Sequence, residues 1–354
     1  MKKTIKLDNS ENTVVFGRTP VSEEGTAMFW TGSGVEFNIR ASELYINIEC
    51  GYNERELMLD ILLDGERSQK LTLENGIRKY VIFKGMDPGK SINVRVVRDT
   101  QCMADDAESY IMLKSIETDG EFAGLHQYDF NIEFIGDSLT SGEGCGLIKR
   151  AEWAPVVFDA LESYTYKTAG LLNARYDVLS QSGWGLYAAW DADTSHVLPD
   201  YYEQVCGMTK CKKSISLGAH EKYDFSRNEM DVVLINLATN DSNALKTEKF
   251  QKEEFFKAFK QKGIEFLKTI RKNNGACYII WAYGMLGDDM EPYIKEIIKE
   301  YIKETGDKRT EYLKLPDCKG QDLGARFHPT PAAHTKAAQC IADFIRSQQV
   351  YMLR

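Results

Sequence analysis

The sequence predicts an α/β protein, in which a parallel three-layer α/β/α domain follows an antiparallel β-sandwich of the jelly-roll type. At 354 residues the chain is long enough for about two domains. Up to about residue 120, apolar and polar residues alternate with the period of strands. From about residue 128, short apolar runs alternate with helical stretches instead. We therefore expect a sandwich over 1–122 and an α/β domain over 128–354.

The first part carries repeated strand and turn signals. The turn signals are Asp64-Gly65, Asn75-Gly76 and Asp87-Pro88-Gly89, combinations that favour tight reversals of the chain. They separate the alternating runs FNIRASELYINIECGY, ELMLDILLDGE, QKLTLENGIRKYVIFKG, SINVRVVRDT and SYIMLKSIET. Short strands at near-regular spacing are typical of an antiparallel sandwich.

The second part reads as five buried strands interleaved with helices, the pattern of a parallel sheet covered on both faces. Thr247-Glu248 is expected to open a long helix, Gly275 to follow its end, and Pro331 to lie in the first turn of the last helix. A further helical region is expected from about Ala188. The segment 206–228 is predicted to be an insertion that forms a lid or rim.

Composition and charge argue against nucleic acid and membranes as partners of this protein. A net charge of −9 and a pI near 5.3 argue against nucleic acid, whose phosphates favour a basic face. No apolar run approaches the ~20 residues of a membrane span. The N-terminal lysines lack the apolar region of a secretory signal, and the eight cysteines form no C-x-x-C pair. These features predict a cytoplasmic protein with free thiols and without a membrane partner.

Polar residues and glycines follow the predicted strands. In an open parallel sheet, ligands bind at the carboxyl ends of the strands. Ser138, Gly183 and Asn240 follow successive strands, and His328 lies in the loop after the last. Together they offer a hydroxyl, a backbone amide, a carboxamide and an imidazole, which suit a nucleophile, oxyanion donors and a general base.

The stretch NIEFIGDSLTSGEGCG, residues 131–146, allows other interpretations. Ser138 taken alone is typical of a helix N-cap, and G-D-S-L-T does not match the G-x-S-x-G elbow. A phosphate-binding loop is disfavoured because Leu147 stands where G-x-G-x-x-G requires its third glycine, and no G-K-[ST] occurs. The glycines are expected to let the chain pass close to Ser138.

The motifs in their order resemble those of the SGNH (GDSL) hydrolases. Gly136-Asp137-Ser138-Leu139 resembles the first block, Ser182-Gly183 the second, Ala238-Thr239-Asn240-Asp241 the third and His328-Pro329 the fifth. The resemblance implies Ser138 as nucleophile and His328 as base. It implies an oxyanion hole formed by the Gly183 and Ser138 backbone N–H groups and the Asn240 side chain, with the Gly185 amide as an alternative.

Two positions depart from that pattern. Ala238 replaces the usual glycine of the third block, a small change. The family's acid normally stands three residues before the histidine, where this chain has Ala325. We expect a Ser–His dyad in which a backbone carbonyl orients the imidazole, with Asp322 as the alternative third member of a triad. The remaining histidines lack ligand spacing, and His334 is expected to have a surface or packing role. Neither a metal nor a cofactor is expected.

A β-sandwich ahead of such a domain resembles carbohydrate esterase family 2. The resemblance implies acetylated hemicellulose, here manno- or xylo-oligosaccharides, as substrate of an acetyl esterase. Trp184, Trp281 and Tyr283 are the aromatic residues that we expect to stack on sugar rings, and Trp190 lies near them. Two alternatives remain: a carbohydrate-binding protein with a vestigial hydrolase domain, and a lipid or short-chain esterase on the same fold.

Overall fold

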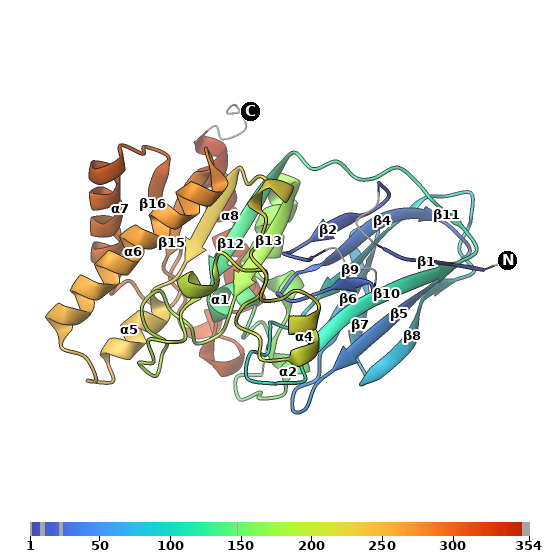
Figure 1. The fold of residues 1–354 in the computed structure, drawn as a ribbon, viewed down its shortest axis with the longest axis horizontal. Helices are drawn as coiled ribbons and strands as arrows, with labels where there is room; N and C mark the ends of the chain where they lie inside the picture. The colour runs from blue at the N-terminus through green and yellow to red at the C-terminus, as the bar shows by residue number, and fades with distance from the viewer. Residues whose placement is uncertain (1, 8–10, 21–23, 147, 349–354) are drawn as a thin grey trace. The chain divides into compact units, whose positions relative to one another are not determined.

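The computed structural model describes residues 2–7, 11–20, 24–146 and 148–348. Contacts divide the chain into two compact units, and each is described by itself (Figure 1). The first unit comprises 1–127, 153–155 and 203–223, and the second comprises 128–152, 156–202 and 224–354. The units therefore differ from the two continuous ranges drawn from the sequence, because the chain returns to the first unit at 203–223.

The described residues of the first unit form an antiparallel, jelly-roll-like β-sandwich. One sheet has the strand order β1-β10-β5-β8, with β3 paired to β10, and the other has β11-β4-β9-β6-β7, with β2 paired to β4. The strands are β1 Lys3–Ile5, β2 Val14–Phe16, β3 Thr26–Ala27, β4 Gly34–Arg40, β5 Glu43–Gly51, β6 Met58–Leu63, β7 Glu66–Thr72, β8 Gly76–Lys84, β9 Ile92–Arg98, β10 Tyr110–Thr118 and β11 Glu121–Phe122.

The predicted turns lie where strands meet. Asp64 and Gly65 join β6 to β7 with φ of 51° and 85°, the conformation of a two-residue hairpin. The segment 203–223 is held to the sandwich by long-range hydrogen bonds: Trp30 Nε1 donates to the Val205 carbonyl at 2.7 Å, and Arg18 to the Gln204 carbonyl at 3.0 Å. The greater part of the expected lid or rim is thus part of the first unit.

The second unit is built on the parallel sheet β13-β12-β14-β15-β16. Its strands are β12 Phe130–Gly136, β13 Ala174–Ser180, β14 Val232–Asn236, β15 Tyr278–Tyr283 and β16 Thr310–Lys314. They are the five strands expected from the sequence. β14 and β15 are buried along their whole length, as the interior of a doubly covered sheet requires.

Helices cover both faces of this sheet. α6 packs on α7, as Figure 1 shows, and α3 packs on α8. Right-handed crossovers place α3 on one face and α6 and α7 on the other, because β13 and β15 lie on opposite sides of β12 in the sheet. α8 follows the last strand and packs on α3. The α-helices are α1 Ser138–Ser141, α2 Ala154–Val157, α3 Tyr164–Leu172, α4 Lys212–Ser216, α5 Thr239–Leu245, α6 Lys252–Asn274, α7 Glu291–Thr305 and α8 Pro331–Ser347. The 3-10 turns are η1 Ala160–Glu162, η2 Leu198–Tyr201, η3 Phe225–Arg227, η4 Gly320–Asp322 and η5 Ala325–Phe327.

The helix signals were accurate at most ends. Gly275 follows α6 and Pro331 opens α8, as predicted. α6 begins at Lys252 instead of Thr247, because Glu248 has a φ of 59°, which no helix accommodates. The helical region expected from Ala188 is wrong: this stretch is a loop up to η2. The N–H groups of Leu186, Tyr187 and Ala188, where this loop begins, bond a buried carboxylate described below.

Among the described residues, no helix combines the length and the apolar character that crossing a membrane would require.

Candidate active site

Ser138 is the first residue of α1, directly after the central strand β12. Ser138 does not cap this helix: the N-cap is Asp137, whose side chain accepts the Leu139 N–H at 3.0 Å. The Ser138 hydroxyl is therefore not needed to end the helix. It lies 2.9 Å from His328 Nε2, the separation expected from the sequence, and the Ser138 side chain is nearly buried.

The second nitrogen of His328 decides the tautomer. Its Nδ1 lies 3.0 Å from the carbonyl oxygen of Arg326. A carbonyl can only accept, so Nδ1 carries the proton and Nε2 is left with a lone pair facing the Ser138 hydroxyl. This is the arrangement in which an imidazole can take the serine proton. A backbone carbonyl thus occupies the place that an acidic side chain has in a triad.

Gly144 explains the glycine-rich stretch after Ser138. It has a φ of 87°, and a Cβ at this position would stand 2.1 Å from the Cβ of His328. Any other residue would displace the imidazole. Gly142, with a φ of 74°, ends α1 and turns the chain back. These glycines bring the chain against the histidine, and they do not form a phosphate-binding turn.

Two backbone amides are candidates for the oxyanion hole. Gly183 follows β13 with a φ of 80°, and within the described residues neither its N–H nor that of Ser138 has an acceptor. The loop that carries Gly183 is fixed by Asp241, whose carboxylate accepts N–H groups of Leu186, Tyr187 and Ala188 at 2.8–2.9 Å. Burial raises the pKa of Asp241 to about 6 despite these three donors. Its supporting role was missed in the sequence, although an acid beside Asn240 in a buried motif was a usable signal.

Asn240 lies in the first turn of α5, and both N–H groups of its amide are engaged. Nδ2 donates to the Trp184 carbonyl at 2.9 Å and to Asp137 Oδ2 at 3.2 Å. Burial raises the pKa of Asp137 to about 7, and the nearby carboxylates of Asp241 and Glu143 add to the effect. Ala238, which precedes the helix, has a φ of 120°, a region that favours glycine. The departure from glycine there carries strain that the sequence did not reveal.

Asp322 does not complete a triad in this structure. Its carboxylate pairs with Lys336 at 2.9 Å, which lowers its pKa, and the Arg326 carbonyl already accepts the Nδ1 proton of His328. The loop does return towards the histidine, but through its backbone: the Asp322 carbonyl accepts the Thr330 N–H. The number of residues between Asp322 and His328 could not show whether the side chain or only the backbone of Asp322 returns towards the histidine.

The structure does not support the prediction that Trp184, Trp281 and Tyr283 stack on sugar rings. Trp281 and Tyr283 lie in β15, in the interior of the sheet, and are buried. Trp281 Nε1 donates to the Leu237 carbonyl at 3.2 Å. Trp184 is also nearly buried, with its ring stacked on His196 at 5.1 Å between centroids. A ring whose faces are covered by protein cannot stack on a sugar.

Trp190 is an exposed aromatic residue in the loop that carries Gly183. It is 61% exposed, and its backbone N–H donates to the Gly183 carbonyl at 2.9 Å. A Cβ on Gly183 would stand 2.8 Å from Trp190 Cδ1, so the indole lies against Gly183. The sequence placed Trp190 in the right loop, but it could not rank the exposure of tryptophans.

The parallel sheet with a Ser–His pair at its carboxyl edge defines the class of protein: a hydrolase fold of the GDSL type. Family comparison agrees. Residues 132–341 match the model of the GDSL-like lipase/acylhydrolases, and residues 15–119 match that of the carbohydrate esterase 2 N-terminal domain. The chain belongs to the GDSL-like lipase/acylhydrolase family and, with its N-terminal domain, to carbohydrate esterase family 2.

Solved structures show the same two-part architecture. An acetyl xylan esterase from the rumen bacterium Butyrivibrio proteoclasticus is 32% identical, with a TM-score of 0.94 and 99% of both chains covered. A family two carbohydrate esterase from Clostridium thermocellum, solved in complex with cellohexaose, is 22% identical with a TM-score of 0.82. It covers 96% of this chain and 99% of its own, and at that identity it shows the fold alone.

Two curated relatives cover most of this chain. The cellulase/esterase CelE of Acetivibrio thermocellus is 24% identical over 94% of the chain, which spans 39% of that relative's length. The acetylxylan esterase / glucomannan deacetylase of Cellvibrio japonicus is 22% identical over 94% of the chain and 87% of its own length.

Proposed function

We propose that the protein is a serine esterase that removes O-acetyl groups from acetylated hemicellulose oligosaccharides, of the xylo- or manno- type. The observation that carries the proposal is the 2.9 Å contact between Ser138 Oγ and the unprotonated nitrogen of His328. The substrate class is supported by the acetyl xylan esterase and glucomannan deacetylase activities in the names of the relatives.

The geometry supports an acyl-enzyme route. Ser138 Oγ attacks the acetyl carbonyl carbon while its proton passes to His328 Nε2. The oxyanion is held by the N–H groups of Gly183 and Ser138, and by the Asn240 amide once it exchanges its longer bond to Asp137. The sugar oxygen then leaves with the proton from His328. Water, activated by the same imidazole, attacks the acetyl-serine, releasing acetate and restoring the serine hydroxyl.

The test is acetate release from acetylated xylo- and manno-oligosaccharides, followed by sugar position. Wild-type turnover is expected, with a loss of at least about 1,000-fold in kcat for Ser138→Ala and for His328→Ala at unchanged Tm. Sugar binding without turnover would instead favour the non-catalytic alternative. Faster turnover of long-chain than of acetate esters would favour the lipid esterase.

We also propose that the protein is cytoplasmic, in a compartment that keeps thiols reduced. All eight cysteines are free thiols, including Cys102 and Cys206, whose sulfur atoms lie 3.8 Å apart. Alkylation of the protein as isolated from its host should modify all eight after unfolding without a reductant. Recovery of a Cys102–Cys206 disulfide from the host would contradict the proposal.

A further inference from the structure

The carbonyl that orients His328 belongs to a residue in an unfavourable backbone conformation. Arg326 has a φ of 49°, and the next residue, Phe327, has a φ of 59°. Left-handed conformations cost non-glycine residues roughly 1–2 kcal/mol each and persist only where the surroundings enforce them. Two in succession, directly before the histidine, therefore require a restraint from elsewhere in the unit.

Part of the restraint comes from the backbone that follows Ser138. The Arg326 N–H donates to the Lys149 carbonyl at 2.8 Å, and the Ala325 N–H donates to the Gly146 carbonyl at 2.8 Å. The Gly144 carbonyl is a second acceptor for Ala325, at 3.1 Å. Backbone hydrogen bonds thus connect the loop that follows Ser138 to the loop that carries His328. One of these bonds is made by Arg326 itself.

The side chain of Arg326 adds a clamp between two carboxylates. One terminal nitrogen bonds Glu143 Oε1 at 2.7 Å, while Nε and the other terminal nitrogen bond Glu152 Oε2 at 2.9 and 2.6 Å. The Glu143 side chain is only 5% exposed, whereas that of Glu152 is 75% exposed. The inner ion pair therefore lies in a low-dielectric setting, where ionic hydrogen bonds are strongest.

Glu143 remains a carboxylate in spite of its burial. Burial alone would raise its pKa, but His328, the Ser182 hydroxyl and the Arg326 guanidinium together hold the pKa below its ordinary value. Glu143 is also followed directly by Gly144, the glycine that lies against the histidine. Glu143 therefore bonds the Arg326 side chain, while the next residue in the chain, Gly144, lies against His328.

We propose that Arg326 is a positioning residue, clamped by Glu143 and Glu152 so that its backbone carbonyl can hold the His328 imidazole, in place of the triad carboxylate this chain lacks. The inference rests on the proposed esterase function and deepens it. A carboxylate side chain carries its own negative charge to the imidazole. A carbonyl contributes only a dipole, so its direction matters more, and the ion pairs fix that direction.

Several charged groups face this cluster and enter any test by pH. Asp137 interacts with Glu143, Asp241 interacts with Asp137, and His334 interacts with His328. Burial raises the pKa of Asp137 to about 7 and that of Asp241 to about 6. The variants and the wild type are therefore compared at one fixed pH.

The test is a series of variants at Arg326 assayed for acetate release. Arg326→Ala keeps the strained backbone and loses both ion pairs, so kcat is expected to fall by about 10- to 100-fold with KM little changed. Arg326→Gly, which accepts a positive φ without strain, and Arg326→Lys, which can keep one carboxylate partner, should each recover part of that loss. Millimolar guanidinium should raise kcat of Arg326→Gly by filling the vacated clamp.

The carboxylates and a control complete the series. Glu143→Gln should lower kcat more than Glu152→Gln, because only Glu143 is buried. Arg346→Ala removes an exposed Arg–Asp pair at the end of α8 and should leave kcat and KM at wild-type values.

Two results would overturn the inference: kcat of Arg326→Ala within twofold of wild type, or a loss that appears in Tm and KM but not in kcat and is not rescued by guanidinium. These are distinguishable from failure of the proposed function. In that case the wild type itself would release no acetate from any acetylated sugar or small acetate ester.

Discussion

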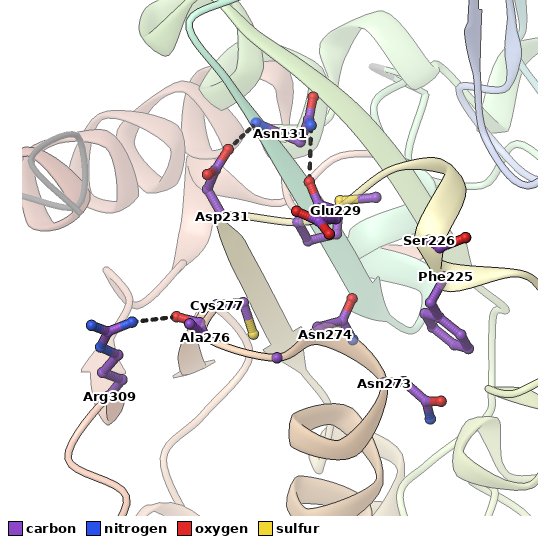
Figure 2. Close-up of a pocket in the computed structure, with 12 residues that line it drawn as sticks. Asn131, Phe225, Ser226, Glu229, Asp231, Asn273, Asn274, Ala276, Cys277 and Arg309 are labelled. Atoms are coloured by element: carbon purple, nitrogen blue, oxygen red, sulfur yellow. Dashed lines mark hydrogen bonds between the residues drawn. The ribbon is translucent and has the colours of Figure 1, made fainter. Parts of the chain in front are cut away.

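The two ends of the parallel sheet carry similar polar residues but put them to different uses. At the carboxyl ends, Ser138 and His328 face each other, and the N–H of Gly183 has no acceptor within the described residues. At the amino ends, a cavity of about 700 Å³ is lined by side chains that include Asn131, Asp231 and Arg309 (Figure 2).

At the amino ends, polar groups bond one another. The Asn131 side chain donates to the Glu229 carbonyl at 2.9 Å, and the Asn131 backbone N–H donates to Asp231 at 2.7 Å (Figure 2). Arg309 donates to the Ala276 carbonyl at 2.7 Å. A cavity with polar walls is thus not by itself a site. Chemistry requires donors and acceptors that the fold has left available, and these lie at the carboxyl end.

The largest expected contrast between the two ends concerns their asparagines. Asn240→Ala should lower kcat by about 100- to 1,000-fold, since a donor to the developing oxyanion is lost. The matched control is Asn131→Ala, which removes a similar amide at the amino end and should leave kcat unchanged. Steady-state acetate release measures both. A loss below tenfold for Asn240→Ala would remove this residue from the oxyanion hole and leave the two backbone amides.

A smaller effect is expected at Trp190, an exposed aromatic residue of the carboxyl end. Trp190→Ala should raise KM for an acetylated oligosaccharide by about 3- to 10-fold, if stacking on a sugar ring is worth as much as an aromatic pair, about 0.5–1.5 kcal/mol. KM for a small acetate ester, which has no ring to stack, should not change. Phe225→Leu, at the cavity of Figure 2, is the control. Equal changes in KM for both kinds of substrate would contradict a platform role for Trp190.

The same contrast between available and engaged groups holds for two histidines. His334, six residues after His328, is buried in α8 and accepts the Tyr164 N–H through Nδ1 at 3.1 Å. Burial lowers the pKa of His334 to about 3, with Lys167 and His328 contributing. Of the two roles predicted for it, at the surface or in packing, its burial agrees with packing.

The consequence is a pH-dependent stability. The unfolded chain binds a proton at His334 that the native state excludes, so this contribution is complete above about pH 6.5 and declines as the pH falls towards 3. His334→Gln removes the titration. Urea unfolding at pH 7.5 and pH 5 should show a smaller decrease in the free energy of unfolding for the variant than for the wild type. An identical decrease in both would assign the pH dependence to other groups.

The smallest effect is expected at the amino-end cavity. Arg309→Met loses one hydrogen bond to a carbonyl and should lower the free energy of unfolding by about 1 kcal/mol, with kcat and KM unchanged. A change of kcat by more than a few fold would show that the cavity is coupled to the reaction and would break the comparison of the two ends.

The sequence by itself determined the fold class, the strands of the parallel sheet and the pairing of Ser138 with His328 at its carboxyl edge. These follow from local signals: hydrophobic periodicity, turn residues, and short motifs directly after strands. It also determined that no acid stands three residues before His328. It predicted a backbone carbonyl in place of that acid, but not which residue supplies it, because the Arg326 carbonyl is oriented by contacts with Glu143 and Glu152, far away in the chain.

Tertiary structure alone decided which groups are covered and which are available. The sequence puts both Trp281 and Trp190 near the carboxyl ends of predicted strands. In the structure, Trp281 is buried in β15, whereas Trp190 is 61% exposed. The return of 203–223 to the sandwich likewise depends on hydrogen bonds such as that from Trp30. Exposure and hydrogen-bond partners are properties of surroundings assembled from distant segments, so no local pattern of residues encodes them.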